Sequence, residues 1–118
     1  METNRSPRMT QPTQAVLRAL LVEPNKPMYG SQVCAEAGLP SGTIYPILAR
    51  LEREYGWLES EWEDPDISIA EGRPRRRYYQ LSRDGAQAAR LALAESYQAR
   101  HHNGRKFGGK AGPAGVTS

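Results

Sequence analysis

The 118-residue sequence is poor in the features that build disulfides, membrane spans or large hydrophobic cores. Its single cysteine, Cys34, excludes an internal disulfide and is typical of a protein in a reducing cytoplasm. No run of about 18 apolar residues occurs, so no membrane span is predicted, and the polar N-terminus does not resemble a signal peptide. A hydrophobic share of 38% favours one small domain with polar ends.

The motifs of common enzymes and metal sites are also missing. There is no Gly-rich phosphate loop, no Ser-His-Asp order and no metal-protease motif. The adjacent His101 and His102 would point to different faces of a helix, with no other ligand at suitable spacing. Glu59, Glu61 and Glu63 alternate along a segment close to arginines, as charge partners do, and not as a general acid and base. We therefore expect no enzyme, no metal and no cofactor.

Charge is distributed unevenly, although the formal net charge is only +3. Acidic residues crowd within residues 52–71, and four arginines occupy the five positions 73–77. Basic residues return in the C-terminal tail. This distribution permits nucleic-acid binding without requiring it.

Residues 41–55 form the clearest amphipathic helix. Four apolar residues recur at helical spacing, namely Ile44, Ile47, Leu48 and Leu51. Ser41 is expected to cap the start of this helix. The opposite side carries hydroxyl, aromatic, small and cationic residues that suit DNA reading, namely Thr43, Tyr45, Pro46, Ala49, Arg50 and Arg53. An ordinary surface helix has the same pattern, so the flanking segments must decide.

Two shorter helices are predicted before this one. Residues 10–22 place apolar side chains on one face, with Thr10 as the cap and Pro12 in the first turn. Residues 23–27 read as a loop, and residues 28–37 as a helix that Gly38 terminates. The turn that follows has only a few residues, so the second and third helices make a helix-turn-helix. Helix pairs of this kind also occur in proteins that bind no DNA.

A β-hairpin is predicted next. Residues 57–63 alternate as a half-buried strand, residues 64–72 form a turn-rich tip, and residues 73–81 return as a second strand. Its acidic first arm can face its cationic second arm, which would account for the arginines structurally. Alternatively the hairpin is a wing whose arginines reach phosphates or a narrow minor groove, which four arginines in five positions favour.

Residues 83–101 should form the last helix, capped by Ser82 and rich in good helix formers. Apolar residues on two of its sides indicate packing against its own domain and against a second chain. A helix that only closes one core would show a similar pattern. The tail, residues 103–118, has almost nothing to bury and is expected to be disordered. We therefore divide the chain into a flexible N-terminus (1–9), a DNA-binding domain (10–82), a dimerisation helix (83–102) and a basic tail (103–118).

Three sequence blocks follow one another at a specific spacing. They are Met-Tyr-Gly at 28–30, Leu-Pro-Ser-Gly-Thr-Ile-Tyr-Pro at 39–46, and Gly-Arg-Pro-Arg-Arg-Arg-Tyr-Tyr at 72–79. In combination they resemble the PadR family of bacterial transcriptional regulators, which are winged-helix proteins. The resemblance covers about residues 10–100. It implies a mainly α fold with a small β-hairpin, a winged helix-turn-helix followed by a C-terminal dimerisation helix.

The resemblance also implies roles for individual residues. The helix that starts at Ser41 would enter the major groove, and the wing would approach the DNA backbone. The expected DNA-contacting residues are Tyr29, Ser41, Gly42, Thr43, Tyr45, Arg50, Arg53, Arg73, Arg75 and Arg76. The expected dimer-interface residues are Ala86, Ala89, Leu91, Leu93 and Tyr97.

Some members of the smaller branch of this family bind flat aromatic molecules between subunits, against a tryptophan of the last helix. This chain has no tryptophan there, because its two are Trp57 and Trp62. This departure counts against the same ligand-binding role here, and a small aromatic effector is kept only as a candidate partner. Together these inferences predict a cytoplasmic, homodimeric repressor that binds double-stranded DNA at a palindromic operator. The alternative is a protein-binding winged helix, an anti-repressor or adaptor, that uses the acidic hairpin.

Overall fold

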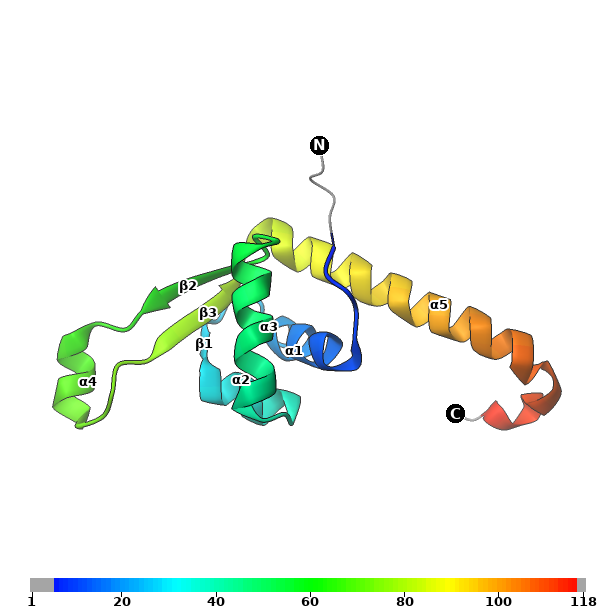
Figure 1. Ribbon diagram of the computed structural model, residues 1–118, viewed down its shortest axis with the longest axis horizontal. Coiled ribbons are helices and arrows are strands. Elements are labelled where there is room, and N and C mark those ends of the chain that lie inside the picture. Colours follow the sequence, from blue (N-terminus) through cyan, green and yellow to red (C-terminus); the bar gives the residue numbers. More distant parts are fainter. Residues whose placement is uncertain (1–5, 117–118) are drawn as a thin grey trace.

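The computed structural model describes the backbone of residues 6–116 and the side chains up to residue 100. This part of the chain forms five helices and one small antiparallel sheet (Figure 1). The elements in chain order are α1 (Gln11–Leu21), β1 (Met28–Tyr29), α2 (Gly30–Ala37), α3 (Ser41–Arg53), β2 (Leu58–Trp62), α4 (Pro65–Glu71), β3 (Arg77–Leu81) and α5 (Arg83–Val116). The predicted fold class is confirmed.

The core lies where α1, α2 and α3 pack together and against the inner face of the sheet. Its buried side chains include Val16, Leu17, Leu20, Val33, Ile44, Ile47, Leu48, Leu51, Leu58, Tyr79 and Leu81. Each fully buried Leu or Ile contributes roughly 1.5–3 kcal/mol relative to an exposed one. The apolar stripe predicted for α3 is therefore the stripe that holds this helix on the core, which leaves its other side free.

The start of the second helix was predicted wrongly. Residues 28–37 were expected to be helical throughout, but Met28 and Tyr29 form β1 and the helix begins at Gly30. The two residues pair with Tyr79 and Tyr78 of β3, giving the strand order β1-β3-β2. Such a short strand exists only because β3 supplies its hydrogen-bond partners, which are far away in the sequence. The helix ends at Gly38 as predicted.

The cap of α3 is also different from the prediction. Pro40, with φ −74° and ψ 158°, is the N-cap, and Ser41 is already the first helical residue. The carbonyl of Pro40 accepts hydrogen bonds from the amides of Thr43 and Ile44 at 3.0 and 3.1 Å. Because the backbone of Pro40 takes the capping position, the hydroxyl of Ser41 is left exposed at the leading end of the helix.

The tip of the hairpin is a helix and not a set of turns. Asp64 caps α4 by accepting from the amide of Asp66 at 2.9 Å, and Pro65 occupies the first turn. Gly72 closes the helix with φ 66°, a left-handed conformation that glycine adopts without strain. The second strand consequently starts only at Arg77, so residues 73–76 are an extended arm and not part of the sheet.

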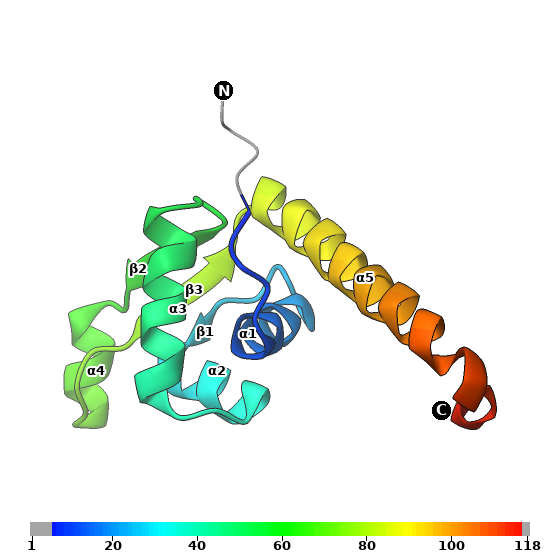
Figure 2. The same ribbon diagram turned by 45° about the vertical axis from the view of Figure 1, so that its right-hand side comes forward.

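The last helix, α5, begins as predicted, because Ser82 Oγ accepts from the amide of Gly85 at 2.9 Å. It runs to Val116 and is longer than the expected 83–101. The side chains beyond residue 100, which include His101 and His102, lie outside the described part of the structure. Figures 1 and 2 show α5 projecting away from the body, at the end opposite α4.

Two residues that were expected at a dimer interface are in fact inside the domain. Ala86 is 8% exposed and Ala89 is fully buried, because this side of α5 packs on the chain's own core. Leu93 also packs partly against that core. Leu91 and Tyr97 are 59% and 55% exposed. Among the helices of the described residues, none combines the length and apolar character that a membrane crossing requires.

Candidate nucleic-acid interface

The outward side of α3 carries the side chains that sequence reasoning assigned to DNA. Ser41, Gly42, Arg50 and Arg53 are exposed, and Thr43 is half-buried. Because the opposite stripe is buried in the core, this side is fixed in direction by the packing of the helix. It offers hydroxyl donors at its leading end and guanidinium groups in its last two turns.

Tyr45 links α3 to the start of α2. Its side chain is 44% exposed, yet its ring lies over Gly30, where an added Cβ would meet the ring carbons and the hydroxyl. Gly30 is therefore needed for this close approach and not only for backbone freedom. The contact holds the phenol between the two helices, on the same side as the exposed residues of α3.

Arg73 forms its hydrogen bonds within the hairpin. Its two Nη atoms donate to the carboxylate of Glu63 at 2.7 and 2.8 Å, and its Nε donates to Glu71 at 2.9 Å. This bidentate hydrogen bond lowers the pKa of Glu63 from 4.5 to about 2, although burial of the carboxylate acts in the opposite direction. The same bond raises the pKa of Arg73. Arg73 thereby has a structural role in the hairpin, and its expected contact with DNA stays a prediction.

Glu63 connects the two arms of the hairpin at the point where β2 ends and the tip begins. Besides Arg73, its carboxylate accepts from the amide of Arg76 at 3.1 Å, and its backbone carbonyl accepts from Nε of Arg75 at 3.1 Å. The amide of Glu63 in turn donates to the carbonyl of Arg76 at 2.8 Å. These bonds continue the pairing of β2 with β3, and the Glu63–Arg73 ion pair joins the acidic first arm to the cationic second arm as expected. Glu59 and Glu61 do not take part in such a pair, because the register sets them opposite Gln80 and Tyr78.

Arg75 and Arg76 are the wing arginines that remain directed at an open surface. The guanidinium of Arg75 lies 5.4 Å from the ring of Trp62, and that of Arg76 lies 3.9 Å from the ring of Tyr29. Tyr29 is itself held edge-on against Tyr78 at 5.5 Å. Stacking on rings orients a guanidinium while leaving its N–H groups able to donate to another partner.

Arg77 is a site residue that sequence reasoning did not single out. Its Nε donates to Ser60 Oγ at 3.0 Å, and that hydroxyl donates to Glu52 Oε2 at 2.6 Å. Its Nη2 also lies 3.7 Å from the same Glu52 oxygen. Since Glu52 belongs to α3 while Ser60 and Arg77 belong to β2 and β3, this chain of bonds ties α3 to the hairpin. Strand alternation placed Arg77 beside Tyr79 on the inner face and was the signal for it.

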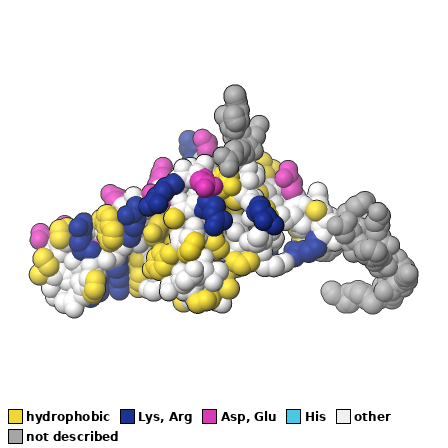
Figure 3. Space-filling model, in the orientation of Figure 1, with side chains coloured by type: hydrophobic (Ala, Val, Ile, Leu, Met, Phe, Trp, Pro, Cys, Tyr) yellow, Lys and Arg dark blue, Asp and Glu magenta, His cyan; other side chains and the backbone are white. Residues whose placement is uncertain are grey.

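These groups meet around one cavity of about 460 Å³. Its lining includes Tyr29, Gly30, Ser31, Tyr45, Trp62, Arg73, Pro74, Arg75, Arg76, Arg77 and Tyr79. Figure 3 shows Lys and Arg side chains distributed over the hairpin and the body on one face of the molecule. The structure therefore brings Tyr29, Tyr45 and the wing arginines together, while Arg50 and Arg53 lie further along α3. Within the described residues, no cluster of His, Cys, Asp and Glu could hold a metal ion.

Known proteins of one family resemble this chain. The model of the transcriptional regulator PadR-like family matches residues 19–91. A crystal structure of a PadR family transcription regulator from hypervirulent Clostridium difficile R20291 is 21% identical, with a TM-score of 0.63 over 83% of this chain and 98% of that chain. No curated protein matches the sequence.

Two further solved structures are similar to the chain. The PcaV transcriptional regulator from Streptomyces coelicolor, in complex with its natural ligand, is 26% identical, with a TM-score of 0.55 over 90% of this chain and 79% of that chain. A possible transcriptional regulator from Methanosarcina mazei Go1 is 17% identical, with a TM-score of 0.54 over 84% and 78% of the two chains.

Proposed function

The chain belongs to the PadR-like family of transcriptional regulators, and from this premise we propose that it represses transcription by binding a partly palindromic operator as a homodimer. Members of this family are DNA-binding regulators and not enzymes. The cytoplasm is the compartment we expect, because a repressor must reach the chromosome.

One observation carries the proposal. The exposed side of α3 and the extended arm that holds Arg75 and Arg76 border the same side of the domain, with Tyr45 and Tyr29 between them. A helix of this width fits the major groove, where its leading residues can reach base edges. The arm would then lie along the flanking backbone, where guanidinium groups bind phosphates.

The dimer is proposed from α5. This helix projects from the domain and exposes Leu91 and Tyr97, which is unusual for a helix that only closes a core (Figure 2). Two copies related by a two-fold axis would present two α3 helices to successive major grooves, about 34–36 Å apart. A small aromatic effector would release the operator if it bound another separation of the two helices more tightly.

Footprinting on DNA from upstream of the protein's own gene tests the function. We expect two protected half-sites whose centres lie about one helical turn, 10–10.5 base pairs, apart. A duplex of the same composition in scrambled order should bind more weakly at equal salt. Two results together would overturn the proposal in favour of a protein-binding winged helix. They are equal affinity for both duplexes, and a failure to enrich any sequence when the protein selects from a pool of random duplexes.

A further inference from the structure

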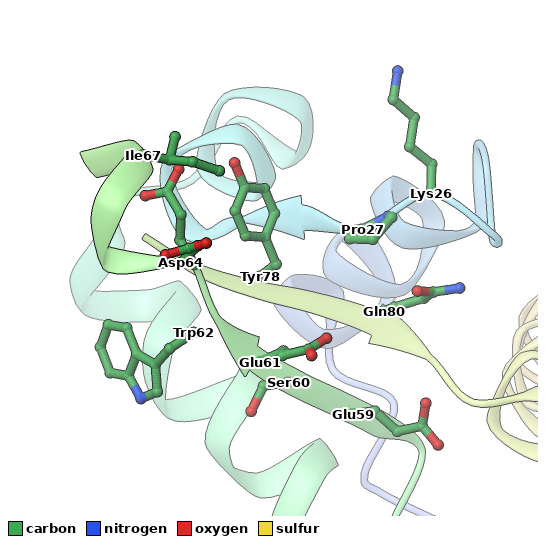
Figure 4. A pocket seen from close by; sticks show the side chains of 11 residues that line it. Lys26, Pro27, Glu59, Ser60, Glu61, Trp62, Asp64, Ile67, Tyr78 and Gln80 are labelled. Atoms are coloured by element: carbon green, nitrogen blue, oxygen red, sulfur yellow. The ribbon is translucent and has the colours of Figure 1, made fainter. Parts of the chain in front are cut away.

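A second cavity, of about 520 Å³, opens on the outer side of the hairpin. Its lining comprises Lys26, Pro27, Glu59, Ser60, Glu61, Trp62, Glu63, Asp64, Ile67, Tyr78 and Gln80. In Figure 4, Glu59, Glu61, Tyr78 and Gln80 rise from one side of the two strands, while Trp62 and Ser60 point to the other side and contribute only to the rim. Its volume lies in the range of small-molecule sites, roughly 300–1,000 Å³.

The electrostatic character of this outer pocket is negative. Glu59 and Glu61 are exposed and have no ion pair among the described residues, and Asp64 stands at one end. The one cation in the lining, Lys26, lies 3.5 Å from Glu23 and is held at the opposite rim. None of the wing arginines contributes to this lining. A chain with a positive net charge thus has a locally anionic pocket, which disfavours phosphate and favours a cation.

The walls between the carboxylates are apolar. Ile67 of α4 is 47% exposed toward this side, and Pro27 faces it across the pocket. The ring of Tyr78 stands between them and is fixed edge-on by Tyr29 at 5.5 Å. A fixed aromatic ring and an aliphatic wall would take up an apolar body, and a ring face also attracts a cationic group.

We propose that the outer pocket binds a small organic cation that carries an apolar body. A bare metal ion does not fit, because no three potential ligands in the described residues approach one another closely enough. An organic cation instead uses both properties, since carboxylates at the floor neutralise its charge while Ile67, Pro27 and Tyr78 cover its hydrocarbon surface. This proposal goes beyond DNA binding and does not depend on it.

Calorimetric titration of the full chain, without DNA, tests the proposal with two probes of matched shape. Tetraphenylphosphonium is a cation and tetraphenylborate is an anion of nearly the same size. We expect saturable binding of the cation and at least tenfold weaker binding of the anion, because the two differ only in the sign of their charge. Equal binding of both would show an apolar surface without charge selection and would overturn the assignment.

Substitutions locate the site. The Glu59→Gln/Glu61→Gln variant removes two charges and should raise the dissociation constant of the cation about tenfold. The matched control, Glu36→Gln/Glu54→Gln, removes two exposed carboxylates on α2 and at the end of α3 and should leave that constant unchanged.

A third variant separates the apolar contact from the charge. Ile67→Ser shortens the exposed aliphatic wall and should weaken both probes by a similar factor, because it changes no charge. If the Glu59→Gln/Glu61→Gln variant and its control had the same dissociation constant for the cation, the cation would bind elsewhere. That result would refute the outer pocket as its site.

Discussion

At the scale of single residues, Glu63 makes more of the hydrogen bonds that hold the hairpin together than its position in an acidic stretch indicates. Its carboxylate is 5% exposed and receives two N–H groups of Arg73 and the amide of Arg76. A charge held in this way stabilises the fold only while it is ionised. Because the pKa of Glu63 falls from 4.5 to about 2 on folding, its contribution is complete above pH 4.5 and is lost as the pH falls through 2.

The first prediction concerns this pH dependence. Glu63→Gln should lower the free energy of unfolding at neutral pH, and the difference from the wild type should narrow as the pH falls from about 4.5 toward 2. Urea unfolding at a series of pH values, followed by the fluorescence of the buried Trp57, measures it. Glu61→Gln is the control and should show no such narrowing. A difference that stayed constant down to pH 2 would mean that the charge of Glu63 is not what stabilises the wing.

The second prediction concerns the contact of Gly30 with Tyr45. Gly30→Ala places a methyl group against the phenol ring. Since the outer end of Tyr45 can swing away, stability should change by about 1 kcal/mol or less. Affinity for a duplex selected from random sequences should nevertheless fall, because the ring leaves its place on the α3 side. Fluorescence anisotropy measures the affinity. In a Tyr45→Ala background the same glycine substitution should have no further effect, and an equal loss there would disprove the role of the ring.

At the scale of elements, the bond chain from Glu52 through Ser60 to Arg77 fixes the angle between α3 and the wing. Ser60→Ala removes the hydroxyl at its centre and should cost roughly 1 kcal/mol of stability. It should weaken binding to a selected duplex more than to random DNA, because it loosens geometry and removes no cation. Anisotropy titrations at several salt concentrations should give an unchanged salt slope. Ser96→Ala, on α5, is the control, and a smaller slope in Ser60→Ala would contradict a positioning role.

The dimer proposal is an element-scale claim about α5. Leu91→Glu puts a charge on a side chain that is 59% exposed in the single chain, so the fold should persist while the dimer dissociates. Size-exclusion chromatography with light scattering reports the mass. Gln87→Glu adds the same charge at another exposed position of α5 and should leave the mass at twice that of the chain. A Leu91→Glu chain that still forms dimers would move the interface to another surface.

The elements that could be predicted from the sequence are those held by their own periodicity. The apolar repeats of α1 and α3 gave correct helices, because burial of one face stabilises them wherever they pack. The two-residue β1 could not be found, since its partners in β3 are about fifty residues away. By contrast α4 carried readable signals in Asp64, Pro65 and Gly72, which were interpreted as a turn.

The residue types of the candidate site could be predicted from the sequence, but the partner of each arginine could not. Four neighbouring arginines look alike in a sequence, whereas the structure gives Arg73 to Glu63 and Arg77 to Ser60. Those assignments depend on carboxyl and hydroxyl groups 10 and 17 positions away. Strand alternation was a local signal for Arg77, but only tertiary packing brings Arg73 to its carboxylates, so no local pattern could have separated Arg73 from Arg75 and Arg76.

At the scale of the whole molecule, the hairpin has two electrically different sides. Arg75 and Arg76 lie beside Tyr29 and Trp62 on the side shared with α3, whereas Glu59 and Glu61 line the outer pocket. On the proposed function, phosphates would be attracted to the first side and repelled by the second, so we expect the domain to approach a duplex with the first side. The acidic stretch that suggested a protein-binding module would then also assist DNA binding, by disfavouring the opposite approach.

The last prediction tests whether the arginine side of the hairpin contacts the phosphates of DNA. Arg75→Ala/Arg76→Ala should weaken binding to a selected duplex and to random DNA by similar factors, because guanidinium groups on phosphates carry no sequence information. The slope of log affinity against log salt should become shallower by about 0.9 for each phosphate contact removed. Arg18→Ala/Arg83→Ala removes two exposed cations elsewhere and should leave the slope unchanged. If the slope of the wing variant equalled that of this control, Arg75 and Arg76 would not contact DNA, and α3 alone would have to account for binding.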